Sequence, residues 1–155
     1  MIYSMDSFEI MQLNTSHQKD NLVIDRCIVN NLYLSALTFS KPVTINNSII
    51  GYFDAVGVNF TGGFILRNCI VCDSASFDSG GFNSIDSEFV IENNIFRGFV
   101  DFFHSQFDGP FIFKNNIVLA ESNLLGLEDV YSKPVFTSSC NVEGNIGNLY
   151  ANAVL

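Results

Sequence analysis

An eight-residue pattern of apolar and polar positions recurs along the chain at intervals of 21, 21, 25 and 22 residues. In each copy the first and third positions are large and apolar, the fourth is polar or charged, and the fifth is Arg or Asn. The alternation predicts a short strand, and the Asn predicts a turn, because Asn tolerates the left-handed conformation. The five copies are LVIDRCIV from Leu22, VTINNSII from Val43, FILRNCIV from Phe64, FVIENNIF from Phe89 and FIFKNNIV from Phe111.

A five-residue step runs inside this longer period. If the third and eighth positions face inward, each has an inward companion two residues earlier, because side chains alternate along a strand. Each coil then has four inward pairs, which describe a four-sided tube. We therefore predict an all-β fold, a right-handed parallel β-helix (solenoid) with coils of about 21 to 25 residues. After a one-residue slip the third coil continues with Ala75, Phe77, Gly80 and Phe82, followed by a longer corner at 83–88.

Three five-residue segments place a small residue, a polar residue, Phe and two further small or polar residues in register: Val58–Gly62, Ala75–Ser79 and Ser105–Gly109. They resemble the repeat of the pentapeptide-repeat family, in a loose and Phe-rich form. The resemblance covers roughly residues 22–118 and implies a right-handed quadrilateral β-helix. The chain departs from the family in two ways: its coils are longer than four strict pentapeptides, and the position before each central residue is often apolar.

The repeat also defines the organisation of the chain, which we predict to be a single domain over residues 1–155. Residues 22–118 form the regular coils, and both ends differ because exposed terminal coils must be covered. Residues 1–21 are expected to form an amino-terminal cap or partial coil, with Phe8, Met11 and Leu13 lying 21 residues before Val29, Leu32 and Leu34. Residues 119–155 form the carboxyl-terminal cap, with a short helix in LAESNLLGLEDV and a last strand in VFTSSCNV from Val135.

Two rows of apolar residues face outward in this register. The seventh position of the five copies reads Ile28, Ile49, Ile70, Ile95 and Ile117. The second position reads Val23, Thr44, Ile65, Val90 and Ile112. Together they predict a flat apolar strip larger than monomers commonly expose. We interpret it as an interface with a protein partner or a second copy; the alternative is that the carboxyl-terminal segment covers it with Leu124, Leu125, Leu127 and Val130.

The charge of the chain argues against direct binding of nucleic acid. Sixteen acidic and seven basic residues give a formal charge of −9, whereas phosphate binding requires clustered Lys and Arg. Some pentapeptide-repeat proteins that confer quinolone resistance imitate DNA with an acidic rod, so the resemblance keeps DNA mimicry as an alternative function. Ordinary solvation of the surface is the simpler account of the acids, of which five lie on or near the other strands and corners: Asp54, Asp73, Asp78, Asp101 and Asp108.

No catalytic, cofactor-binding or metal-binding residue is assigned, and we expect the protein not to be an enzyme. Cys69 and Cys72 form a single C-x-x-C, but Cys69 shares its repeat position with Cys27, and a zinc site needs four converging ligands. We read Cys69 as a small interior residue and all four cysteines as reduced. Neither His17 nor His104 lies beside a recognisable nucleophile. A carbohydrate-binding or carbohydrate-processing β-helix is a further alternative, although no carboxylate pair stands out.

The amino terminus lacks the basic start and apolar core of a signal peptide, and the chain has no run of about eighteen apolar residues. We therefore expect no membrane insertion and either a cytoplasmic protein or one segment of a longer protein.

Overall fold

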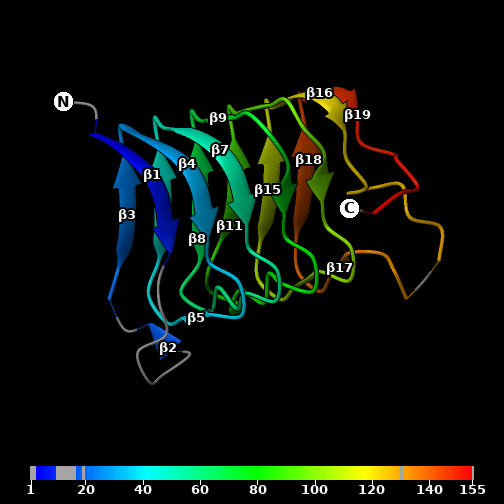
Figure 1. Cartoon of the computed structure of the whole chain (residues 1–155). Helices are drawn as coiled ribbons and strands as arrows, with labels where there is room; N and C mark the ends of the chain where they lie inside the picture. The colour runs from blue at the N-terminus through cyan, green and yellow to red at the C-terminus, as the bar shows by residue number, and fades with distance from the viewer. Residues whose placement is uncertain (1–2, 10–16, 19, 130, 155) are drawn as a thin grey trace.

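The computed structural model of the chain describes residues 3–9, 17–18, 20–129 and 131–154. Short parallel strands stack in layers as a right-handed β-solenoid, and the described residues contain no helix. Figure 1 shows the layers following one another from β1 (Tyr3–Glu9) at the amino end to β18 (Cys140–Glu143) and β19 (Ile146–Asn148) at the carboxyl end. The predicted all-β fold class is confirmed.

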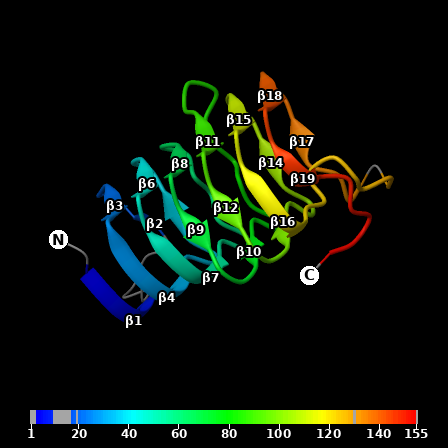
Figure 2. The same cartoon turned by 90° about the horizontal axis from the view of Figure 1, so that it is seen from above.

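Two long parallel sheets form two walls of the tube, as Figure 2 shows from above. The six-stranded sheet contains β3 (Leu22–Asp25), β6 (Val43–Asn46), β8 (Phe64–Arg67), β11 (Phe89–Glu92), β15 (Phe111–Lys114) and β18. The nine-stranded sheet contains β1, β4 (Cys27–Tyr33), β7 (Ile49–Asp54), β9 (Ile70–Val71), β12 (Ile95–Phe96), β16 (Ile117–Glu121) and β19, with β10 (Ala75–Ser76) and β13 (Val100–Asp101) beside this row. Two further pairs join β2 (His17–Gln18) to β5 (Thr38–Phe39) and β14 (Gln106–Phe107) to β17 (Val135–Phe136).

The six-stranded sheet aligns the five blocks in the predicted register. Its paired first positions are Leu22 with Val43, Val43 with Phe64, Phe64 with Phe89, and Phe89 with Phe111. A sixth block continues the sheet, because Cys140 pairs with Phe111. Sequence analysis placed Val135 at this position, which is wrong: Val135 pairs with Gln106 on another side of the tube. The insertion before Cys140 makes this coil 29 residues long, and that length hid the repeat.

A residue in the left-handed conformation follows each strand of the six-stranded sheet. The φ angles are 51° to 59° at Arg26, Asn47, Asn68, Asn93 and Asn115, and 68° at Gly144. Asn47 Nδ2 donates a hydrogen bond to Asp25 Oδ1 at 2.9 Å, and Asn68 Nδ2 donates to Asn47 Oδ1 at 3.4 Å. The first bond, assisted by the Arg26 guanidinium, lowers the pKa of Asp25. The predicted turn is confirmed at these positions, and the Asn side chains link neighbouring coils.

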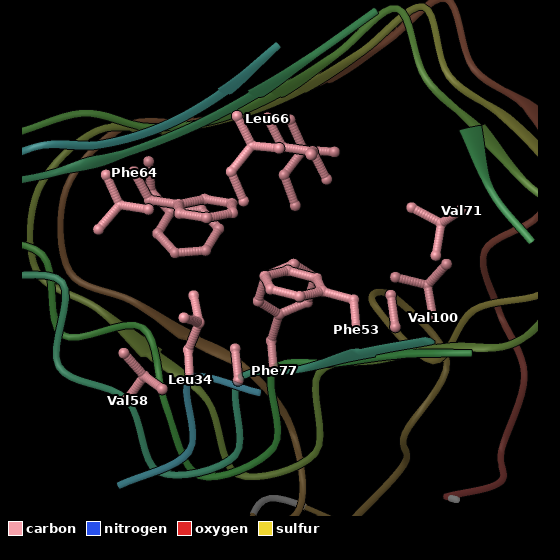
Figure 3. Close-up of a cluster of buried hydrophobic side chains, with 14 of the residues drawn as sticks. Leu34, Phe53, Val58, Phe64, Leu66, Val71, Phe77 and Val100 are labelled. Atoms are coloured by element: carbon pink, nitrogen blue, oxygen red, sulfur yellow. The ribbon is translucent and has the colours of Figure 1, made fainter. Parts of the chain in front are cut away.

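Phe side chains fill most of the interior. Phe64, Phe89 and Phe111 are completely buried, with ring centroids 4.7 and 5.8 Å apart along the stack. In Figure 3, Phe64 projects from one wall of the tube toward Phe53 and Phe77 on the opposite wall. Burying apolar surface is worth about 25 cal/mol per Å², so these ladders are the main source of stability.

Phe82 departs from the predicted inward register. Its φ is 41° and its side chain is only half-buried. The ring of Phe89 continues the interior row instead, 5.6 Å from Phe60 and 4.8 Å from Phe107 between centroids. The left-handed backbone at Phe82 redirects the chain into the longer corner at 83–88, which the sequence did place correctly.

A ladder of Asn side chains runs through the interior beside the left-handed corners. The side-chain oxygens of Asn94, Asn116 and Asn145 accept the backbone N–H groups of Cys69, Asn94 and Asn116, at 2.9, 3.0 and 2.9 Å. Their Nδ2 atoms donate to the carbonyl oxygens of Leu66, Ile91 and Phe113. The ladder thus pairs corner backbone groups that would otherwise be buried without partners.

The fourth positions of the blocks form a row of exposed ion pairs. Arg67 and Glu92 are 3.0 Å apart. The strand register places Lys114 beside Glu92, but the Nζ of Lys114 pairs with Glu143 of the sixth block at 3.1 Å.

The amino-terminal segment forms the expected partial coil in a different register. β1 pairs with β4 so that Met5 lies opposite Val29 and Phe8 opposite Leu32, an offset of 24 residues rather than the predicted 21. β2 pairs with β5 at an offset of 21, since His17 lies opposite Thr38. Met11 and Leu13 lie outside the described residues.

The carboxyl-terminal segment contains turns and strands where a short helix was predicted. Ser122 Oγ accepts the N–H of Leu124 at 3.2 Å, and Asn123 Oδ1 accepts the N–H of Phe102 at 2.7 Å. Such side-chain bonds to the backbone compete with helix formation. The helix prediction for 119–130 is therefore wrong within its described residues, and the segment continues the coils instead.

Candidate interaction surface

One row of outward Ile residues runs along the nine-stranded sheet. Successive members pair directly, from Ile28 and Ile49 onward, and the row continues to a sixth member, Ile146, opposite Ile117. Ile49, Ile70 and Ile146 are 40%, 36% and 65% exposed. We call this set the Ile row: Ile28, Ile49, Ile70, Ile95, Ile117 and Ile146. Sequence analysis missed Ile146 because it missed the sixth block.

The second predicted row lies on the other sheet. Its members pair within the six-stranded sheet and are Val23, Thr44, Ile65, Val90 and Ile112. The left-handed corner separates the second position of each block from the seventh, so the two rows do not form the single flat strip that was predicted. Val90 is also completely buried, between Ile65 and Ile112 in the sheet, whereas Val23 is 62% exposed. Of the two predicted rows, the Ile row is the one that continues without a buried member along one wall.

The carboxyl-terminal segment closes part of the tube's end and leaves the Ile row uncovered. Leu124 is buried within the main hydrophobic core, and Leu127 is buried as well. The N–H of Leu125 donates to the carbonyl oxygen of Leu149 at 2.9 Å, which holds the segment against the end of the chain. The alternative in which these leucines fold over the Ile row is wrong, and Val130 lies outside the described residues.

The acidic residues near the corners have local structural partners. Asp54, Asp101 and Asp73 accept hydrogen bonds from the backbone N–H groups of Val56, Phe103 and Ser74, at 3.0, 3.0 and 2.9 Å. Asp108 accepts from Gln106 Nε2 at 2.8 Å, and Asp78 from Ser79 Oγ at 2.7 Å. Asp101 is only 2% exposed and also accepts from Asn123. These acids therefore stabilise turns, which is a sufficient reason for their positions.

The cysteines and the described histidine show no arrangement for catalysis. Cys69 is buried and its pKa is raised to about 11 by burial, while Cys72 is exposed, so the C-x-x-C does not converge on one point. Cys69 is thus the small interior residue that was predicted. His104 is exposed, and its ring lies 3.8 Å from that of Phe103 between centroids. The side chain of His17 lies outside the described part of the chain.

Among the described residues, cavities open at the 83–88 corner and at the carboxyl end. One, of about 380 Å³, lies at the 83–88 corner against Pro42, Gly62 and Ile65. The other, of about 190 Å³, lies at the carboxyl end between Leu124, Leu127 and Phe136. Within the described ranges no group of three or more His, Cys, Asp or Glu residues is placed to hold a metal ion, and no helix there is long and apolar enough to span a membrane.

Comparison with the models of known families, with curated proteins and with solved structures gives no match.

Proposed function

We propose that this protein is a non-enzymatic β-solenoid related to the pentapeptide-repeat family, and that it serves as a protein-interaction module. Support for the family comes from the central Phe residues of the three matching segments, Phe60, Phe77 and Phe107, which are all completely buried. Inward central residues at five-residue spacing are what the family's tube requires.

The observation that carries the functional proposal is the Ile row. Six β-branched side chains stand in line on one rigid sheet, and the two near its middle, Ile49 and Ile70, are 40% and 36% exposed. Because covering apolar surface is worth about 25 cal/mol per Å², a partner with a matching apolar stripe gains from burying the row. The partner we propose is a second copy, since a two-fold axis across the sheet places one Ile row against another. A different protein with an equally flat apolar stripe is the alternative partner.

The test is the molar mass in solution of the protein and of the variant Ile49→Lys/Ile70→Lys. We expect the parent to form a dimer whose mass halves in the double variant, because the two ammonium groups that each protomer would bury have no acidic partner across the interface. Val23→Lys is the matched control: it adds a charge to an exposed position on the other sheet and is expected to leave the dimer intact.

Circular dichroism and thermal unfolding must show that both variants keep the solenoid. A parent protein that is monomeric at all accessible concentrations would contradict self-association through the Ile row. An equal loss of dimer in Val23→Lys would contradict the assignment of the dimer interface to the nine-stranded sheet.

A further inference from the structure

The carboxyl end of the six-stranded sheet is an open layer of the repeat. In the layer below it, Phe111 and Phe113 are completely buried. Cys140 and Val142 occupy the same inward positions one layer later, yet Cys140 is exposed and Val142 is only half-buried. The outer edge of β18 pairs with no described strand, and Figure 2 shows β18 as the last strand of its wall.

The Asn ladder is open at the same end. In the third to fifth blocks, the backbone N–H of the sixth position is accepted by the side-chain oxygen of the next layer, as Asn116 does for Asn94 and Asn145 does for Asn116. No described residue offers such an oxygen to the N–H of Asn145. A further layer with Asn at its sixth position would complete the series.

The charged residues at the fourth positions of the blocks give a third requirement for a further layer. The fourth positions alternate in sign from Arg67 to Glu92 to Lys114 to Glu143. Glu143 ends the series with a side chain that is 71% exposed. A Lys or Arg at the fourth position of the next strand would continue the alternation, because opposite charges on neighbouring strands attract.

We propose that the end of the tube at β18 binds an extended polypeptide strand, which adds to the sheet in parallel as a seventh layer. The partner has apolar residues over Cys140 and Val142, Lys or Arg beside Glu143, and Asn over Asn145. Main-chain hydrogen bonds give such strand addition its affinity, and the side-chain positions give it specificity. The site is separate from the Ile row and does not depend on it.

A second copy of the chain does not meet these requirements. Head-to-tail stacking would bring its β3 onto β18 and set Asp25 beside Glu143, with like charges adjacent. It would also place Cys27, which has no side-chain oxygen, over Asn145. A two-fold contact between two β18 edges would be antiparallel and would not continue the ladder.

The chain's own fifth block supplies a probe with the required pattern. We would synthesise Gly109–Glu121 with a fluorescent label and measure its binding to the whole protein by anisotropy. We expect saturable binding that is lost in the protein variant Val142→Lys. The variant Ile49→Lys/Ile70→Lys should bind the peptide normally, which separates this site from the proposed function. Val23→Lys, at the opposite end of the same sheet, is the matched control and should also bind normally.

Two changes in the peptide test its register. Replacing the Asn that corresponds to Asn116 by Ala should weaken binding about tenfold, because the N–H of Asn145 would be buried unpaired. Replacing the Lys that corresponds to Lys114 by Glu should weaken binding about fivefold. The protein variant Glu143→Lys should restore binding of that Glu peptide.

Absence of binding by the parent peptide would overturn the proposal. So would equal binding of a scrambled peptide, or failure of Glu143→Lys to restore the Glu peptide. A dimer that persists in Ile49→Lys/Ile70→Lys and disappears in Val142→Lys would show that a second copy occupies this end instead.

Discussion

The fifth and sixth coils contain the same pattern in the same register, but their side chains have different surroundings. Phe111, Phe113 and Asn116 are completely buried, whereas their counterparts Cys140, Val142 and Asn145 are exposed or half-buried. The block itself does not decide burial, since burial requires a neighbouring layer on both sides. Stability in such a stack is a sum of nearest-neighbour terms, so the last coil contributes less than an inner one. The protection of a buried thiol, the stacking of Phe rings and the pairing of Asn side chains should therefore all be weaker in the last coil than in an inner coil.

The difference in burial between inner and last coils should have its largest effect on the rate at which cysteine thiols are alkylated. Variants that retain only Cys69 or only Cys140 should differ at least a thousandfold in alkylation rate at pH 8. Cys69 is buried and burial raises its pKa to about 11, so little thiolate forms at pH 8 and the alkylating reagent reaches the sulfur only after the coil opens. A thousandfold corresponds to about 4 kcal/mol of opening free energy. Mass spectrometry of timed samples gives the rates, and similar rates would show that the inner coils open as readily as the last.

The next effect concerns the Phe ladder and is measured by urea unfolding. Phe89→Ala should lower the free energy of unfolding by about 3 to 5 kcal/mol, because it leaves a cavity in the middle of the stack. Phe89 contacts rings on both sides, including Phe64 and Phe111. Phe136→Ala should cost about half as much, since Phe136 is only partly buried and its ring contacts are with Phe107 and Phe111. Equal losses of unfolding free energy in the two variants would contradict the expectation that an inner layer contributes more stability than a terminal one.

The smallest effect separates two members of the Asn ladder. Asn116→Ala should cost about 2 to 3 kcal/mol, because it leaves the N–H of Asn94 buried and unpaired and removes the hydrogen bond that Asn116 Nδ2 donates to the carbonyl oxygen of Ile91. Asn145→Ala should cost about 1 kcal/mol, because water reaches the half-buried end of the ladder. Thermal and urea unfolding of both variants check the order, and a larger loss in Asn145→Ala would reverse it.

Periodicity predicts the inner coils because their inward positions are large, apolar and evenly spaced. The sixth block escaped notice because its first residue is Cys140 instead of Phe, its corner residue is Gly144 instead of Asn, and the preceding coil is longer. Both substitutions fit an open layer, where Cys140 fills no interior and Gly144 adopts a left-handed φ without strain. The available signal was the Asn-Ile pair at 145–146, which repeats the sixth and seventh positions of two earlier blocks.

The interaction surface was predicted only in part, for a geometric reason. The alternation of side chains identifies outward residues, but it does not reveal that the corner between Val23 and Ile28 places them on different walls. The Asn ladder was missed for a related reason. Side-chain alternation places Asn94 and Asn116 at inward positions, but it does not reveal that each side chain reaches backbone atoms of a neighbouring coil.

The unequal lengths of the coils have a practical consequence for protein engineering. The corner at 83–88 adds residues without disturbing the strand register on either side, and Ile85 at its tip is 72% exposed. A peptide epitope or a small reporter domain inserted between Ile85 and Asp86 would be displayed on a stiff rod at a fixed height. The tube could therefore act as a ruler for spacing attached groups.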